Sequence, residues 1–175
     1  PCAPILFDTV VDGRPVKAVA QPTKQAFLYV FDRVTGKPLW PIDERPVPKG
    51  DVPGEWYSPT QPIPSKPPAY DRQGVTENDL IDFTPALRRE ALEIVAWHKM
   101  GPLFTPPVVS NIDGPLGTLM APSQDGGTNW PGGSFDPETG ILYVASQGSV
   151  VSKGLVAPLP GQSDMAYVEG NAVTG

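Results

Sequence analysis

The sequence has one cysteine, one histidine and no long apolar segment in 175 residues. A single cysteine cannot form an internal disulfide, and it cannot build a cysteine-based zinc site. No run of about 18 apolar residues occurs, so no segment is long enough to span a membrane as a helix. The formal net charge is −6 and no basic block is present. We therefore expect no nucleic-acid partner.

Motifs of several common enzyme classes are also missing. There is no G-x-S-x-G nucleophile elbow and no H-E-x-x-H helix. There is no P-loop, and the glycine-rich "WPGGSFD" leads into a strand pattern and not into a helix, which argues against a dinucleotide-binding fingerprint. Cys2 is interpreted as a small buried residue. His98 has no second ligand at metal-binding spacing, so we interpret it as a packed or surface residue of a helix.

Proline and glycine, by contrast, are abundant, with 24 and 18 residues. Such a content approaches the level at which disorder is expected. Because 39% of the residues are hydrophobic and several runs have strand character, we predict a loop-rich β-protein. The proline-rich stretch 43–76 carries Trp56, Tyr57 and Tyr70, which favours an ordered, packed insertion over a flexible linker.

Residues 1–42 predict an antiparallel meander of four short strands. "ILFDTVV" and "VKAVAQ" flank an Asp12-Gly13 dipeptide, a strong hairpin signal. "AFLYVFD" is apolar on both faces and is expected to be buried on both. A turn at Gly36 then leads to a fourth strand that contains Trp40.

Residues 77–100 are expected to be helical, so that residues 43–101 form a proline-rich and helical insertion. Thr76 and Asp79 have the spacing of a capping box. Thr84 and Pro85 fit the N-cap and the first helical position, and Gly101 follows the last residue of the periodic pattern.

Residues 102–175 return to strand patterns, and they repeat a motif of the first part. "FDRVTG" at 31–36 and "FDPETG" at 135–140 share the pattern F-D-x-x-T-G. Without the insertion, their separation falls to about 45 residues, a spacing typical of β-propeller blades. Two unrelated turns of a common type would also explain the pattern.

Two places could carry chemistry. Lys24 precedes the apolar strand and could present a charge to a pocket, although spacing alone favours a lysine that extends into solvent. The loop "GGTNWPGG" offers the amide of Asn129 and the flat ring of Trp130 beside paired glycines. It would suit a planar polar ligand, and it could equally be a glycine-rich turn anchored by a core tryptophan.

Taken together, these segments resemble a known enzyme family. "KAVAQPTKQAFLYVFDRVTGKPLWPIDERPVP", "PGEWYSPTQPIPSKPP", "GPLFTPP", "GTLMAPS" and "GGTNWPGGSFDPETGILYV" are similar, in this order, to PQQ-dependent quinoprotein dehydrogenases, most closely the membrane-type glucose dehydrogenase branch. The resemblance covers about residues 1–150.

The resemblance implies an all-β fold, here a partial eight-bladed β-propeller of about two four-stranded antiparallel blades with a proline-rich and helical insertion. It implies pyrroloquinoline quinone (PQQ) and a divalent cation, often Ca²⁺, as cofactors. It also implies oxidation of a sugar or alcohol hydroxyl in the periplasm, with electrons passed to a quinone or a cytochrome.

Residue by residue, Lys24 matches the family lysine that hydrogen-bonds the quinone oxygens, and it is the one catalytic candidate here. Asn129 matches an asparagine at the same quinone edge, and Trp130 is its neighbour. "TGKPLW" resembles the tryptophan docking motif between blades, which makes Trp40 structural.

One departure from the family matters. The family's catalytic aspartate lies about two dozen residues before the lysine, and Asp8 and Asp12 are too close to Lys24 to match it. We expect this base, the cation ligands and the remaining blades to lie outside these residues, so that the chain alone is inactive. A non-catalytic propeller used for binding or assembly, or a homologue without cofactor, remains the alternative.

Overall fold

The computed structural model describes residues 2–172, and the chain divides into two compact units that interleave along the sequence. Unit 1 comprises the residues up to Pro46, Thr60–Gln73 and Pro122–Ser149. Unit 2 comprises Val47–Pro59, Gly74–Ala121 and the chain from Val150 onward. The division of the sequence at residues 42 and 101 stays a prediction.

Both units are built mainly from short strands. Unit 1 contains β1 (Ile5–Val11), β2 (Arg14–Pro22), β3 (Leu28–Asp32), β4 (Ile42–Pro46), β5 (Thr60–Pro64), β11 (Gly133–Asp136) and β12 (Ile141–Val144). Unit 2 contains β6 (Gly74–Val75), the 3₁₀ turn η1 (Glu77–Asp79), α1 (Pro85–Val95), β7 (His98–Lys99), β8 (Gly101–Pro102), β9 (Val108–Val109), β10 (Gly117–Met120), β13 (Val151–Val156) and β14 (Val168–Glu169).

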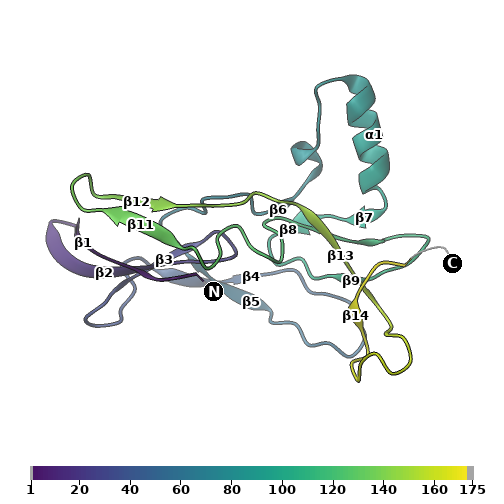
Figure 1. Ribbon diagram of the computed structural model, residues 1–175, viewed down its shortest axis with the longest axis horizontal. Coiled ribbons are helices and arrows are strands. Elements are labelled where there is room, and N and C mark those ends of the chain that lie inside the picture. The colour runs from purple at the N-terminus through teal and green to yellow at the C-terminus, as the bar shows by residue number, and fades with distance from the viewer. Residues whose placement is uncertain (1, 173–175) are drawn as a thin grey trace. The chain divides into compact units, whose positions relative to one another are not determined.

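In unit 1, β1, β2 and β3 form an antiparallel sheet in sequence order (Figure 1). The predicted hairpin turn between β1 and β2 is confirmed. Asp12 and Gly13 take φ values of 50° and 75°. Positive φ at both central residues is what a two-residue type I′ hairpin turn requires. The pairing of Val11 with Arg14 closes the hairpin at these two residues.

The core of unit 1 lies on one face of this sheet. Ala18 and Ala20 of β2 and Leu28 and Val30 of β3 are buried together. Trp40 is partly buried and packs against them. The expectation that "AFLYVFD" is buried on both faces is confirmed for the face of Ala26, Leu28 and Val30. On the other face Phe27 is buried, but Tyr29 and Phe31 are half-buried.

The prediction of a fourth strand in the meander was wrong. After β3, the chain makes a single bridge from Phe31 to Pro38, and Trp40 lies in a bend. Proline has no backbone N–H to donate to a longer ladder, and Pro41 follows directly after Trp40. The next strand, β4, pairs instead with β5 in a separate two-stranded ribbon.

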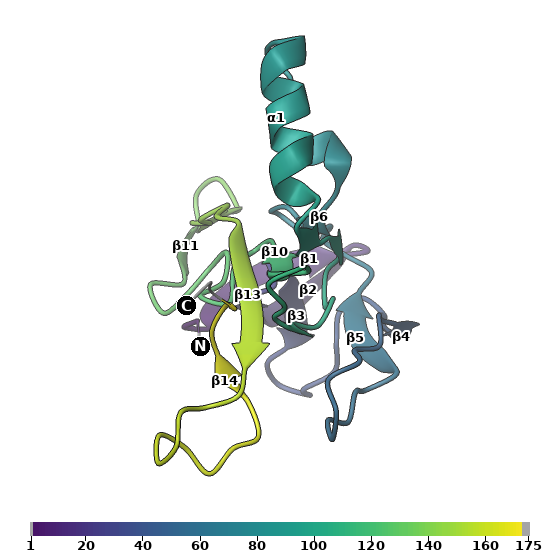
Figure 2. The same cartoon turned by 90° about the vertical axis from the view of Figure 1, so that its right-hand side faces the viewer.

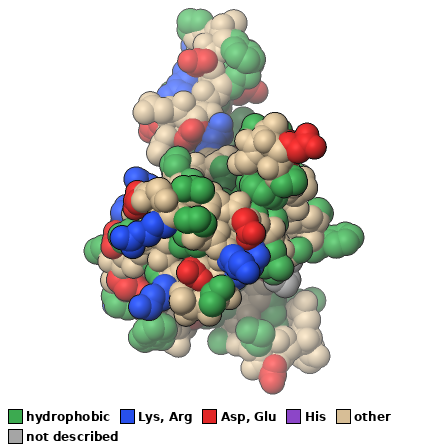
Figure 3. Space-filling model, turned by 90° about the vertical axis from the view of Figure 1, so that its left-hand side faces the viewer, with side chains coloured by type: hydrophobic (Ala, Val, Ile, Leu, Met, Phe, Trp, Pro, Cys, Tyr) green, Lys and Arg blue, Asp and Glu red, His purple; other side chains and the backbone are tan. Residues whose placement is uncertain are grey.

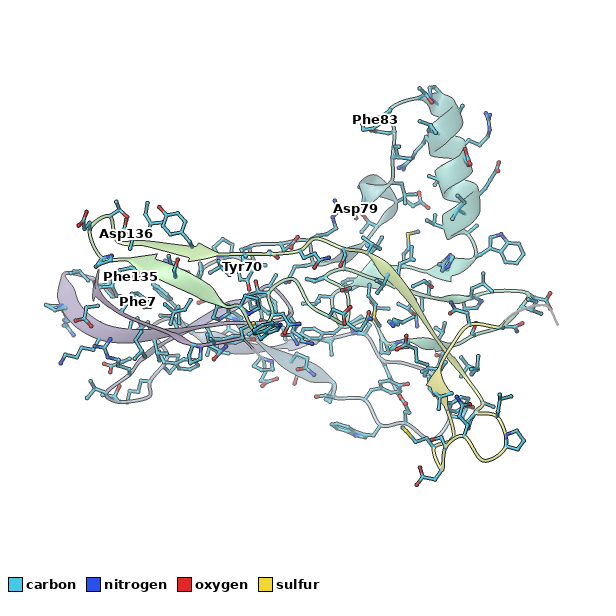
Figure 4. The ribbon with its side chains drawn as sticks, in the orientation of Figure 1. Phe7, Tyr70, Asp79, Phe83, Phe135 and Asp136 are labelled. Atoms are coloured by element: carbon cyan, nitrogen blue, oxygen red, sulfur yellow. The ribbon has the colours of Figure 1, made fainter. Side chains whose placement is uncertain are left out.

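A second antiparallel ribbon in unit 1, β11 and β12, lies against β1. The rings of Phe7 and Phe135 face each other at a centroid distance of 5.0 Å (Figure 4). Their planes are tilted by 41°, a common geometry for aromatic pairs. Residues 128 positions apart in the sequence thus form one packed layer.

The two F-D-x-x-T-G motifs form the same turn. Asp32 accepts hydrogen bonds from the backbone N–H groups of Val34 and Thr35, and Gly36 N–H donates to the carbonyl of Asp32. In the second motif, Asp136 accepts from Glu138 N–H and from the Thr139 hydroxyl, and Gly140 N–H donates to the carbonyl of Asp136. Both glycines are left-handed, with φ of 73° and 71°. The two copies of the motif therefore form equivalent turns, whatever the number of blades.

These hydrogen bonds make both turns sensitive to acid. The pKa of Asp32 is lowered mainly by the N–H of Thr35, and that of Asp136 mainly by the hydroxyl of Thr139. A lowered folded-state pKa adds stability that is complete above the unfolded value, near 3.8, and is lost as the pH falls through the folded value.

We therefore predict that the double variant Asp32→Asn/Asp136→Asn is less stable than the wild type at about pH 6, and that the difference shrinks toward about pH 2. Urea midpoints across this range measure it. Asp164→Asn, in an exposed loop, is the control. A difference that stays constant with pH would contradict the assignment.

The proline-rich stretch is ordered but only partly packed. Tyr57 is half-buried, and its hydroxyl accepts a hydrogen bond from Val52 N–H. Tyr70 is half-buried as well, and packs against the core of unit 1. Trp56, however, is 81% exposed, so its presence did not indicate packing within this chain.

In unit 2, β10 and β13 are the centre of a mixed sheet, with β7 and β9 joining in parallel and β14 antiparallel. The capping box of Thr76 and Asp79 is confirmed, as are Thr84 as N-cap and Pro85 at the start of α1. Figure 2 shows α1 extending away from β6.

Helix α1 ends at Val95, earlier than predicted. The helical pattern through Met100 was wrong, because His98 and Lys99 pair with β10 in the sheet. His98 is half-buried, and its Nδ1 lies 3.3 Å from the carbonyl oxygen of Ile94. It is a packed residue, but on a strand and not on the helix.

Candidate functional site

Lys24 lies in a tight turn between β2 and β3. Thr23 N–H donates to the carbonyl of Phe27 at 3.0 Å, and Ala26 N–H donates to the carbonyl of Thr23 at 3.0 Å. Ala26 takes a left-handed φ of 61°, which is uncommon for a residue with a side chain and makes the turn sharper. Pro22, fully buried, ends β2 immediately before the turn.

The side chain of Lys24 is half-buried and weakly bonded. Its Nζ lies 3.5 Å from the carbonyl oxygen of Gln124, at the outer limit of a hydrogen bond. Within the described part of the chain, no carboxylate forms an ion pair with it. The ammonium group therefore keeps donors for a ligand.

The glycine-rich loop packs directly against this turn. Gly127 N–H donates to the carbonyl of Lys24 at 2.9 Å. A side chain at Gly126 would lie 2.5 Å from Cβ of Lys24, and Gly126 has a φ of 90°. Only glycine satisfies both requirements. The two places that the sequence singled out, about 100 residues apart, are thus in contact.

Asn129 is held within the same loop. Its Nδ2 donates to the carbonyl of Asp125 at 3.0 Å, and its Oδ1 accepts from Trp130 N–H at 2.9 Å. An amide nitrogen carries two protons, so one N–H is left for another acceptor. Asn129 is half-buried and fixed in orientation.

Trp130 is 77% exposed, so it does not anchor the loop from the core. The interpretation of the loop as a turn built on a core tryptophan was wrong. The loop is held by backbone bonds and by Thr128, which is buried, whereas most of the Trp130 side chain is in contact with solvent. An exposed flat ring beside a fixed amide is suited to a planar ligand.

A cleft of about 240 Å³ runs along this loop. Its walls include Asp125, Asn129, Pro131 and Gln147. The volume is somewhat below the usual range for small-molecule sites, about 300 Å³ upward.

Two further side chains support the loop, and sequence reasoning did not assign them to the site. Tyr70 donates to the hydroxyl oxygen of Thr128 at 2.9 Å and contacts the carbonyl of Thr23 at 3.1 Å. Tyr70 had been singled out only as an aromatic in a proline-rich stretch, and no local pattern marks Thr128. Both contacts join residues far apart in the sequence.

The surface carries no extended basic area on the side drawn in Figure 3, where acidic, basic and apolar side chains are interspersed. Among residues 2–172, no group of three or more histidine, cysteine or acidic side chains could hold a metal ion. In the same range, no helix is both long and apolar enough to cross a membrane. Cys2 is buried and donates to the carbonyl of Thr128, as expected for a structural thiol.

The described residues form a mostly-β fold in which one strand-turn motif occurs twice, a feature of repeat-built β-proteins. A comparison with protein families is more specific. Residues 1–172 match the β-propeller domain of PQQ-dependent glucose, ethanol and alcohol dehydrogenases. The chain belongs to this family.

Curated relatives agree with the family. The chain is 36% identical over 134 residues to the glycerol dehydrogenase large subunit of Gluconobacter oxydans (strain 621H), covering 76% of this chain and 17% of the relative. It is 35% identical over 145 residues to quinate/shikimate dehydrogenase (quinone) of Acinetobacter baylyi, covering 82% and 17%.

A third relative is the quinoprotein glucose dehydrogenase of Escherichia coli (strain K12), 33% identical over 148 residues, with 82% and 17% covered. The chain thus spans about a sixth of the length of these relatives. No solved structure matches.

Proposed function

We propose that this chain is part of a PQQ-dependent dehydrogenase that oxidises a hydroxyl group of a sugar or alcohol. The observation that carries the proposal is the contact between the Lys24 turn and the Asn129 loop, in which Gly127 N–H donates a hydrogen bond to the carbonyl of Lys24. This contact supports the proposal because it joins the two segments whose polar side chains the family resemblance assigns to one edge of the cofactor, although Asn129 lines the cleft along the loop and Lys24 does not.

The residues present fit an anionic quinone. Lys24 supplies a cation without a paired carboxylate among the described residues, and Asn129 supplies an oriented amide N–H. The exposed ring of Trp130 can line one side of a planar group. Gly126 and Gly127 keep the loop close to the turn without obstruction by side chains.

When bound, PQQ supplies an ortho-quinone that accepts two electrons from a substrate C–OH. Lys24 would donate hydrogen bonds to the quinone oxygens and offset the negative charge that develops there during reduction. Asn129 would donate to the same edge and hold its orientation. Lys24 stands on a short turn braced by four backbone hydrogen bonds, which fix the point from which its side chain would extend to the cofactor.

The named relatives suggest the substrate class. Glycerol, glucose and quinate, after which relatives are named, each carry several hydroxyl groups. We therefore infer a polyhydroxy substrate, with a quinone or a cytochrome as electron acceptor. We also propose that the chain contributes about two blades of an eight-bladed propeller in the periplasm, that Trp40 docks one blade on the next, and that Ca²⁺ is bound by residues outside this chain.

An assay of the complete dehydrogenase with added PQQ and Ca²⁺ tests this function. We expect dye reduction with at least one of glycerol, glucose and quinate, together with the absorbance of bound cofactor. If neither dye reduction nor cofactor absorbance is observed, the non-catalytic propeller becomes the better explanation.

A further inference from the structure

Tyr70 joins the two halves of the proposed site at one point. It follows β5 in the proline-rich stretch, and its backbone N–H donates to the carbonyl of Ala26 at 3.1 Å, inside the Lys24 turn. Its ring is half-buried against the core of unit 1. The backbone and the ring together leave the hydroxyl group little freedom of position.

The hydroxyl of Tyr70 reaches the residue before each candidate ligand. It lies 3.1 Å from the carbonyl oxygen of Thr23 and 2.9 Å from Oγ1 of Thr128. Thr23 directly precedes Lys24, and Thr128 directly precedes Asn129. One phenol therefore connects the two segments whose next residues are the proposed cofactor contacts.

The direction of these bonds is fixed by the proton count. Thr128 Oγ1 donates its single proton to the carbonyl of Ala145 at 2.6 Å, so toward Tyr70 it can only accept. The phenol O–H is thus the donor, shared between the Thr23 carbonyl and Thr128. Burial raises the pKa of Tyr70 above its ordinary value of 10.0, which keeps this proton in place at physiological pH.

A second connection makes the arrangement rigid. Gly127 N–H donates to the carbonyl of Lys24, and Gly126 and the Gln124 carbonyl also lie against Lys24. All of these contacts involve Lys24, whereas the Tyr70 hydroxyl attaches the loop to the turn at Thr23 and Thr128, a separate point that restrains the orientation of one segment relative to the other. The position of the Asn129 loop relative to the Lys24 turn then depends in part on the phenol.

We propose that Tyr70 is a positioning residue, whose hydroxyl group sets Lys24 and Asn129 at the spacing needed to bind two neighbouring oxygens of a quinone. This inference rests on the proposed function. The ring of Tyr70 serves the core and the hydroxyl serves the site, so that Tyr70→Phe separates the two roles.

The matched control is Tyr29→Phe. Tyr29 lies in the same unit, its pKa is also raised by burial, and its hydroxyl donates to a backbone carbonyl, that of Pro62, at 2.7 Å. Both variants lose one phenol hydroxyl and one bond to a carbonyl. The ring of Tyr29 packs against Phe27 at the end of the turn, but only the hydroxyl of Tyr70 contacts both the turn and the loop.

Hydrogen exchange in the complete dehydrogenase without cofactor is the first measurement. We expect amides of the 23–27 turn and the 123–130 loop, Gly127 N–H above all, to exchange about threefold to tenfold faster in Tyr70→Phe than in the wild type or Tyr29→Phe. Equal exchange in all three proteins would overturn the proposal, whether or not the protein binds PQQ.

Titration of the same proteins with PQQ is the second measurement. We expect affinity to fall about threefold to tenfold in Tyr70→Phe and to stay unchanged in Tyr29→Phe. We expect Thr128→Val to behave like Tyr70→Phe, and Thr128→Ser, which keeps the hydroxyl, to restore binding. In a Lys24→Ala background the effect of Tyr70→Phe should shrink, since the two act together.

The outcomes distinguish the two proposals. Binding of PQQ by the wild type with unchanged affinity in Tyr70→Phe overturns the role of Tyr70 alone. No binding of PQQ by the wild type overturns the proposed function, and with it the assignment of Tyr70 to a quinone site.

Discussion

Replacing Lys24 by alanine in the complete dehydrogenase is expected to lower kcat by roughly 10²-fold to 10³-fold. This is the usual cost of removing one hydrogen-bond donor that stabilises negative charge developing in the transition state, here on the quinone oxygens. The substituted side chain is half-buried in a turn and has only a weak bond, 3.5 Å long, to the carbonyl of Gln124. Its loss should therefore leave the fold intact. Steady-state kinetics with dye reduction and a far-ultraviolet circular dichroism spectrum measure the two quantities.

Two further variants complete the test. Lys17→Ala removes an exposed lysine of β2 and should leave kcat unchanged. Lys24→Arg keeps the charge but replaces a compact ammonium by a planar fork, so we expect an intermediate loss. If kcat of Lys24→Ala equals that of Lys17→Ala, Lys24 does not act in the reaction.

The largest effect on stability is expected in the core of unit 1, where Val30→Ala should cost about 2 to 3 kcal/mol of unfolding free energy. Val30 is 5% exposed and lies among Ala18, Ala20 and Leu28, so that its two lost methyl groups leave a cavity. The shift of the urea midpoint, at unchanged slope, measures this cost.

Val34→Ala is the matched control, because Val34 lies four residues further on, at the tip of the turn, and is 73% exposed. Surface substitutions of this kind usually change stability by less than about 0.5 kcal/mol. Equal midpoint shifts for both variants would show that the β2–β3 face is not part of the cooperative core.

Local features of this protein could be predicted from the sequence. The Asp12-Gly13 hairpin, the Thr76 and Asp79 capping box and the two F-D-x-x-T-G turns all form as expected. Each depends on hydrogen bonds and backbone angles within about six residues, so the information lies in the segment itself.

Features that depend on distant partners could not be predicted. The helical pattern through His98 is ended by pairing with β10, and the fourth strand of the meander is lost because the chain pairs elsewhere. Trp56 was expected to be packed, and for Trp130 the sequence left a core position open as an alternative to a ligand-facing one, yet both are exposed within this chain. The periodicity of a segment indicates which secondary structures it can form, but pairing and packing with distant segments determine which one forms.

The sequence by itself determined the turns, the caps and, through its resemblance to a family, the identity of Lys24 and Asn129 as candidates. Only the tertiary structure brought the Lys24 turn and the Asn129 loop into contact and revealed that the Tyr70 hydroxyl bonds to both segments. The physical reason is that hydrogen bonds such as those from Tyr70 to Thr23 and Thr128 join segments 47 and 58 residues apart, and no local pattern encodes them.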